Sequence, residues 1–438
     1  MRLRFQLGAA GVVLACALPV LTPAPAAAQT QGWGTFSLFA QTSNQRQDSG
    51  FSSNMTDVLG YLTVHSPSNE NGGLEYAIDI RGANYSGAFQ QNQVSVYNAY
   101  VGMRSANGFG VRLGEMWLND LGALGDIGGA LLEYRSPHAS ILGHLRLGLF
   151  GGMEPQAFQA GFVSGVKKAG GYVAFDGDLG RRHVLGFVTI RNQNMTERQV
   201  LTMLNFLPVG RQFFLYQAAE YDLKGPAGTG KSGLNYFFTN IRYAPSDTIE
   251  FQGTYHHGLS IDSRTITNDE LNGRPVDPRL LTGLLFESEG GRVTVSLSRF
   301  VRVWGGYYRD RNNMDESATG RVQAGFWATD IFGSGVDVTV SDNRSDRTGN
   351  HYDSWYTSIG TSIGRSVYLT ADYTTSLSIV SFTDSGGVTI ESRPQSKRYS
   401  LSGMVNLSRH LSLLLEGERL LEDTSHEDRL MAGFTIRF

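Results

Sequence analysis

The sequence predicts an all-β fold, a transmembrane antiparallel up-and-down β-barrel with an even number of strands, about 22 and within roughly 18 to 22. Three observations predict it. Apolar and polar residues alternate along many short segments, and the N-terminus has the pattern of an export signal. The rest of the chain contains no run of 18 apolar residues that could form a spanning helix.

The N-terminal segment is the first element of this prediction. Two arginines precede an apolar run of 15 residues, and an A-x-A pattern of small residues ends at Ala28. This order predicts a secretory signal peptide over residues 1–28, which leaves residues 29–438 as a single barrel domain. A lipoprotein signal ending at Cys16 is the alternative, but the apolar run continues past that cysteine.

Cysteine content and charge exclude several classes of protein. Cys16 is the only cysteine, so the exported chain would have no disulfide, thiolate nucleophile or Cys-ligated metal. Removing the signal lowers Lys and Arg from 37 to 35 against 40 Asp and Glu, so the net charge moves from −3 to −5. We therefore expect no nucleic-acid partner.

Alternation with a period of two recurs along residues 30–438. Residues 74–81 place Leu74, Tyr76, Ile78 and Ile80 on one face and Glu75, Ala77, Asp79 and Arg81 on the other. Because charges lie at strand centres, and short connections alternate with long ones, we expect the apolar face to meet lipid and the polar face to line a watery lumen. The side chains expected to face lipid include Ile78, Ile80, Phe251, Val293, Val295, Phe326, Val338 and Leu369.

The count of strands depends on one weak segment. The residues "VLTMLNF" within 198–206 do not alternate clearly. Without a strand there, the segments that begin near residues 212 and 234 would have to run in the same direction, which the short connection between them forbids. Including it gives 22 strands, an even number that returns both termini to one side of the membrane.

The chain ends in "MAGFTIRF", with Gly433, Phe434, Ile436 and Phe438 in phase. This ending resembles the C-terminal recognition signal of Gram-negative outer-membrane β-barrel proteins, apart from Met431, where that family usually has a polar residue. The resemblance implies an outer-membrane location, contact with outer-membrane lipid and insertion by the barrel-assembly machinery. It indicates a porin-like barrel and reaches no specific subfamily.

Residues 225–232, "GPAGTGKS", match the phosphate-binding loop pattern, but their context does not. An alternating segment precedes them, and Gly233 followed by aromatic residues comes after, whereas a phosphate loop leads into a helix. We interpret the segment as a polar hairpin loop and expect no nucleotide partner. His256 and His257 are adjacent and would face opposite sides of a strand, so we expect no metal site and no cofactor. Serines are common, but no motif ties them to His144, His183 or His351, so we expect no enzyme activity.

The lumen-facing charges and one outer loop form the candidate site. Residues predicted to line the pore are Glu75, Asp79, Arg81, Arg104, Arg112, Arg146, Arg242, Arg302 and Arg321. The third outer loop, 115–129, is apolar, glycine-rich and acidic. It is predicted either to fold inward as a constriction carrying Glu115, Trp117, Asp120 and Asp126, or to pack as an ordinary outer loop. The loop 258–290 is the second candidate filler, with a short helix expected after Asp277 and Pro278.

These features predict an outer-membrane channel for passive or loosely selective passage of small hydrophilic solutes. The alternatives are an export barrel for a polysaccharide, and a non-conducting structural or adhesive barrel. An excess of lumen-facing arginines, Arg191 among them, predicts a weak anion preference if they remain unpaired; they could instead pair with acids on neighbouring strands.

Overall fold

The computed structural model describes residues 32–67, 72–86, 91–225, 232–315, 317–347, 349–383 and 389–438. The predicted signal peptide, 1–28, lies outside the described residues. The elements are β1 (Trp33–Gln47), β2 (Ser52–His65), β3 (Gly73–Ser86), β4 (Gln91–Arg104), β5 (Phe109–Trp117), η2 (Asn119–Gly125), β6 (Asp126–Ser140), β7 (Gly143–Pro155), β8 (Phe162–Asp176), η3 (Asp178–Gly180), β9 (Arg182–Asn192), β10 (Met195–Val209), β11 (Phe213–Lys224), β12 (Gly233–Tyr243), β13 (Ile249–Ser260), α2 (Ser263–Leu271), α3 (Pro278–Thr282), β14 (Leu284–Ser296), β15 (Val301–Asn312), β16 (Thr319–Ala328), η4 (Ile331–Gly333), β17 (Val336–Arg347), β18 (Asn350–Ile363), β19 (Val367–Thr383), β20 (Thr389–Ser392), β21 (Gln395–Asn406), β22 (Leu411–Glu422) and β23 (Ser425–Arg437).

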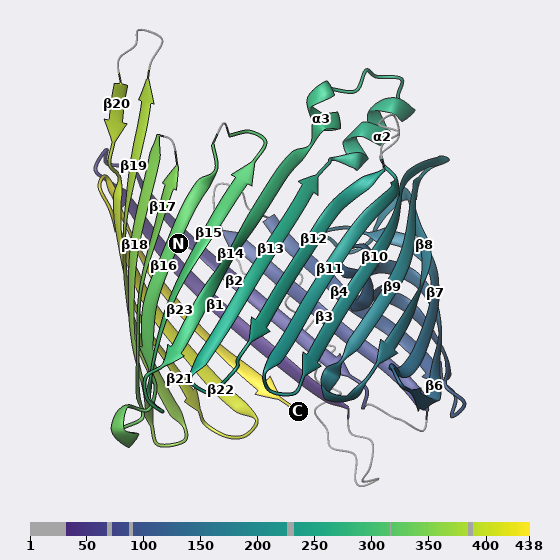
Figure 1. Cartoon of the computed structure of the whole chain (residues 1–438), viewed down its shortest axis with the longest axis horizontal. Coiled ribbons are helices and arrows are strands. Elements are labelled where there is room, and N and C mark those ends of the chain that lie inside the picture. The colour runs from purple at the N-terminus through teal and green to yellow at the C-terminus, as the bar shows by residue number, and fades with distance from the viewer. Residues whose placement is uncertain are drawn as a thin grey trace, which may run out of the picture.

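Twenty-two of these strands form one closed antiparallel barrel, in which neighbours along the chain are neighbours in the wall (Figure 1). The predicted all-β barrel with an even strand number is confirmed. The weak segment forms the tenth strand, β10, between β9 and β11. The short β20 pairs with β19 alone and extends the β19–β21 hairpin beyond the wall, so it adds no strand to the barrel.

The barrel closes between its first and last strands. β1 and β23 pair antiparallel from Thr35 opposite Arg437 to Gln47 opposite Ser425. The Gly34 amide donates to the Phe438 carbonyl at 2.7 Å, and the Phe438 amide donates back at 3.0 Å. Closure gives both edge strands a hydrogen-bonding partner. A sheet in lipid requires this, because no water is present there to form hydrogen bonds with unpaired backbone groups.

The strand register separates two faces, because directly paired residues of neighbouring strands point the same way. The connection η2 between β5 and β6 contacts β9 and β10, which are not its neighbours in the wall, so it lies on the concave side. That contact marks the lumen face. The eight side chains expected to meet lipid all lie on the opposite, outward face.

The α-helices α2 and α3 lie at one end of the barrel, the upper end in Figure 1, which we call the α2 end. The expected helix after Asp277 is α3, and the Asp277 carboxylate accepts the Arg279 amide at 2.9 Å as its N-cap. The helix α2 in the same loop was not predicted. Within the described ranges, no helix is long and apolar enough to cross a membrane.

The segment 225–232 connects two paired strands. β11 and β12 run antiparallel on either side of it, so a strand, and not a helix, follows the glycine-rich residues. Residues 226–231 lie outside the described residues. The strand context agrees with the interpretation of a hairpin loop.

Candidate functional site

One sector of the lumen face is apolar, which the alternation pattern did not predict. Strands β6 to β10 point buried hydrophobic side chains inward, and together with Met116 of β5 and residues of the β5–β6 connection they form one core. Its members are Met116, Leu118, Leu121, Leu124, Ile127, Leu131, Phe150, Val166, Tyr172, Ala174, Val184, Val188, Ile190 and Val200. The outward positions of these strands are also apolar, so the wall is hydrophobic on both sides here.

The connection η2 covers this sector from inside the barrel. Leu121 is 1% exposed and Leu124 is 6% exposed, and η2 packs against β9 and β10. Gly186 makes the approach possible, because a Cβ there would lie 2.3 Å from Leu121 Cδ2. An apolar connection gains free energy by burial, so it folds onto the apolar wall and leaves the water.

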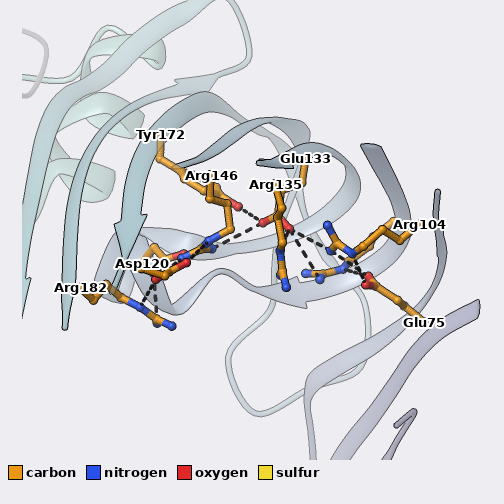
Figure 2. Close-up of polar contacts among 10 residues, drawn as sticks. Glu75, Arg104, Asp120, Glu133, Arg135, Arg146, Tyr172 and Arg182 are labelled. Carbon is orange, nitrogen blue, oxygen red and sulfur yellow. Dashed lines mark hydrogen bonds and ion pairs between the residues drawn. The ribbon is translucent and has the colours of Figure 1, made fainter. Parts of the chain in front are cut away.

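Arg146 ties η2 to the wall at the centre of a charge cluster (Figure 2). Its guanidinium donates to Asp120 of η2 at 2.5 Å and to Asp176 at 2.9 Å, and lies 3.5 Å from Glu133. Arg182 lies 3.4 Å from the same Asp120 and 2.8 Å from Asp176. Asp120 is buried, and two guanidinium groups meet the requirement that a buried charge be paired.

The cluster continues across β3 to β6. Arg104 donates to Glu75 at 2.6 Å and to Glu133 at 3.0 Å, and Arg112 donates to Glu75 at 2.8 Å. Arg135 also donates to Glu133, at 2.6 Å, and Tyr172 donates its hydroxyl to the same carboxylate. In total five guanidinium groups (Arg104, Arg112, Arg135, Arg146 and Arg182) meet four carboxylates (Glu75, Asp120, Glu133 and Asp176).

A second set of ion pairs holds α2 over the same sector. Arg264 of α2 donates to Glu197 at 2.7 Å and to Glu154 at 3.0 Å, and Lys168 lies 3.4 Å from Glu154. Burial disfavours the charge on Arg264, but the hydrogen bond to Glu197 and the charges of both carboxylates outweigh it and raise the pKa of Arg264 above its usual value. The Asn192 amide also donates to Asn268 of α2, at 2.9 Å.

The register places all nine predicted pore-lining residues on the lumen face. Outside the cluster, Arg242 donates to Glu250 at 2.6 Å, and Arg321 lies 3.6 Å from Asp310. Asp79 lies 2.9 Å from the His65 ring. Arg81 lies over the Tyr61 ring, and Arg302 is opposite Trp327. The predicted anion preference required unpaired arginines, and acids pair with most of these.

The expected constriction loop needs correction at three residues, Glu115, Trp117 and Asp126. β5 extends to Trp117, into the segment 115–129 that was predicted to be a loop, so Glu115 and Trp117 belong to the strand. They alternate with Met116, which is 1% exposed on the lumen side, and therefore lie on the outward face. Asp126 opens β6 opposite Trp117, and its carbonyl accepts from Lys168 at 3.2 Å. Of the four expected constriction residues, Asp120 is the one that η2 carries inside. Arg191 is likewise outward, since it alternates with the buried Ile190.

The lumen face of β16 to β21 is polar. Its inward side chains include Gln323, Ser341, Asn343, Ser358, Asp372, Thr374, Ser376 and Ser400. The outward side chains of the same strands include Val322, Ile359 and Leu401, which are 52%, 51% and 63% exposed. The lumen therefore has two unlike sectors: a polar sector along β16–β21, and an apolar sector along β6–β10 that η2 covers.

A cavity of about 690 Å³ lies between η2 and the wall formed by β10 to β14, at the α2 end. Its lining includes an aromatic group of Tyr216, Tyr236, His256 and Phe286, and the charged groups Arg198, Glu220 and Asp222. A volume of this size is typical of small-molecule sites. His256 faces this cavity, and His257 alternates with it on the outward face, where it lies 3.1 Å from Glu287.

The residues of the C-terminal pattern lie at the closing seam. Phe434 and Ile436 face outward, and Gly433 faces the lumen opposite Phe39, where a Cβ would lie 2.1 Å from the Phe39 ring. The backbone of Phe438 forms two hydrogen bonds with the backbone of Gly34. This placement puts the pattern on the strand that closes the barrel.

Comparison with known proteins shows the fold. No family model and no curated protein matches the sequence. Among solved structures, a chain of the E. coli P pilus tip assembly intermediate PapC-PapD-PapK-PapG is similar with a TM-score of 0.50 and 12% identity, over 94% of this chain and 62% of that chain. The chain has an outer-membrane barrel fold. Pseudomonas aeruginosa OpdQ (TM-score 0.44, 10% identity, 93% and 99% coverage) and the PapC usher pore (0.47, 13%, 92% and 99%) are also similar.

The sequence pattern missed several groups of this site. Tyr172 and the α2 contacts of Arg264 were not predicted, because they depend on partners far along the chain. Asp176 and Arg182 carried a usable signal, since both fall on polar positions at the ends of adjacent alternating strands. Among the described residues, no group of three or more His, Cys, Asp or Glu is arranged to hold a metal ion.

Proposed function

We propose that the protein is an outer-membrane channel for passive or loosely selective passage of small hydrophilic solutes. The observation that carries the proposal is the polar lumen sector along β16–β21, which offers hydroxyl, amide and carboxylate groups to a solute inside a lipid-facing barrel. A wall of 22 strands encloses a wide lumen, and the fillers among the described residues, η2 and α2, lie against the opposite sector.

The same proposal includes the route to the membrane. Residues 1–28 would act as a cleaved signal peptide and residues 29–438 as the mature barrel. The barrel-assembly machinery would recognise Gly433, Phe434, Ile436 and Phe438 on the closing strand. The predicted pore-lining residues would supply the charged side chains of the lumen face, and Asp120 would hold η2 inside the barrel. Glu115, Trp117 and Asp126 are left out of the constriction. Passage through this lumen requires no cofactor.

Solute flux into liposomes tests the channel. Liposomes containing the purified protein should swell in small sugars, at rates that fall as sugar size rises, while liposomes with heat-denatured protein should not. Absence of both swelling and conductance would overturn the proposal in favour of a non-conducting barrel. Passage of long oligosaccharides at rates close to those of monosaccharides would overturn it in favour of polysaccharide export.

A pair of variants on one strand locates the path. Ser376 faces the lumen on β19 and Ala371 faces outward on the same strand. Ser376→Trp should lower single-channel conductance, because the indole enters the polar sector, whereas Ala371→Trp should leave conductance unchanged. Equal conductance in both variants would show that ions do not pass along this sector.

A further inference from the structure

The cavity beside η2 contains a carboxylate with few partners. Glu220 of β11 faces this cavity, and its side chain is 19% exposed. Its nearest cation among the described residues is Arg198 at 3.8 Å. Arg198 is held more tightly by Asp222, to which it donates at 2.8 Å, and Asn235 donates to Asp222 as well. Asp222 is therefore satisfied, whereas Glu220 accepts no hydrogen bond from another side chain among the described residues.

Aromatic rings lie on the same wall as this carboxylate. Tyr236 is directly opposite Glu220 in the β11–β12 register, and its ring lies 5.5 Å from the His256 ring. The Phe286 ring also lies 5.5 Å from the His256 ring, and the Tyr216 ring lies 5.8 Å from the Phe238 ring. The rings come from four consecutive strands and form one continuous patch on the lumen face.

Small residues and η2 leave room in front of the rings. Ala218 and Gly258 lie among them on the lumen face, and residues 119–123 of η2 form the opposite wall of the cavity. Gly122 of η2 approaches Glu220 closely, because a Cβ there would lie 3.9 Å from Glu220 Oε1. The carboxylate is therefore enclosed between an aromatic wall and an apolar connection.

Charge decides which solutes this cavity suits. Among the described residues of the lining, Arg198 is the one Lys or Arg, and it faces the two carboxylates of Glu220 and Asp222. These three groups together carry one net negative charge. Asp120 also lines the cavity but is paired with Arg146 and Arg182. Aromatic faces attract organic cations, and a partly desolvated carboxylate needs a positive partner. Among the charged groups of the lining, Asp120, Arg198 and Asp222 have ion-pair partners within 3 Å, which leaves Glu220 as the carboxylate that can accept a positive partner.

We propose that this cavity binds an organic ammonium solute, with the cation at Glu220 and its apolar part on Tyr236 and Phe286. The proposal deepens the channel function and rests on it, since it names a solute class that the lumen would hold at the α2 end. The cavity of about 690 Å³ has room for an aryl-ammonium molecule.

Equilibrium dialysis of the full-length protein in detergent micelles tests the site without requiring conduction. Benzyltrimethylammonium should bind saturably with one site per chain, and benzoate should not. Glu220→Gln should weaken binding at least tenfold. Glu416→Gln makes the same change on the lumen face of β22, outside this cavity, and should leave binding unchanged. Ala218→Phe should abolish binding by filling the cavity without changing its charge.

Three outcomes would overturn the site: no saturable binding by the parent protein, equal affinity for benzoate, or unchanged affinity in Glu220→Gln. Retained heat-modifiable migration on gels would show that each variant is folded. Binding without any solute flux in the liposome assay would refute the channel and leave the ammonium site standing. Solute flux without ammonium binding would refute the ammonium site and leave the channel standing.

Discussion

Asp120 holds η2 against the lumen wall, so its removal should release that connection. The carboxylate accepts from Arg146 at 2.5 Å and lies 3.4 Å from Arg182. A hydrogen bond to a charged group contributes about 1.5 to 3 kcal/mol. In Asp120→Ala, Arg146 keeps Asp176 and Glu133, so no guanidinium is left unpaired. We therefore expect the closed state to lose about 2 to 3 kcal/mol relative to an open state.

Thr202 provides a reporter beneath η2. It is 4% exposed, and its hydroxyl lies next to Leu121 against Gly186. The hydroxyl has no hydrogen-bond partner among the described residues, so Thr202→Cys loses no bond. The chain has one natural cysteine, Cys16, which lies in the predicted signal peptide. A water-soluble maleimide should therefore react with Cys only when η2 opens.

A loss of about 2 to 3 kcal/mol corresponds to roughly 30- to 150-fold faster labelling of Thr202→Cys when Asp120→Ala is added. Asp57→Ala serves as the control, because Asp57 also faces the lumen but lies on β2, away from η2. Labelling rates within threefold of the Thr202→Cys parent would refute the reasoning. In that case the burial of Leu121 and Leu124 alone would hold η2 closed.

Three further predictions concern α2, the closing seam and selectivity. Arg264→Gln leaves the buried Glu197 without its ion pair, at a cost of about 3 to 5 kcal/mol. Chymotrypsin should therefore cleave α2 faster in this variant than in Arg279→Gln, a control at an exposed arginine. Equal cleavage rates in the two variants would contradict this prediction. Gly433→Ala should destabilise the barrel by about 1 to 3 kcal/mol, because its Cβ would lie 2.8 Å from a backbone oxygen. Gly417→Ala meets nothing within 4 Å and should be neutral; similar urea midpoints for both would refute the argument. Since most lumen arginines are paired, reversal potentials under a potassium chloride gradient should stay near zero, and a strong anion preference would show that the ion pairs do not hold.

The sequence by itself determined which segments form the strands of the barrel wall and which side chains of each strand face outward. Alternation with a period of two is a local property, and lipid on one side with water on the other imposes it on every strand. For this reason the strand number, the direction of β10 and the outward positions such as Phe326 and Leu369 could be predicted. The segment 115–129 was predicted to be a loop, but β5 continues to Trp117, so Glu115 and Trp117 lie on the outward face of the strand instead.

Only the tertiary structure decided what lies inside the wall. Arg146 meets Asp120 across 26 residues of sequence, and Arg264 meets Glu154 across 110. Such pairs depend on how the barrel curves and where its connections fold, which no local pattern records. The alternation pattern also could not predict the apolar lumen sector along β6–β10, because the strands there are apolar on both faces. On the lumen side, η2 packs over this apolar surface and shields it from water. Whether an arginine is a free charge in the lumen or an ion-pair partner follows from these contacts alone.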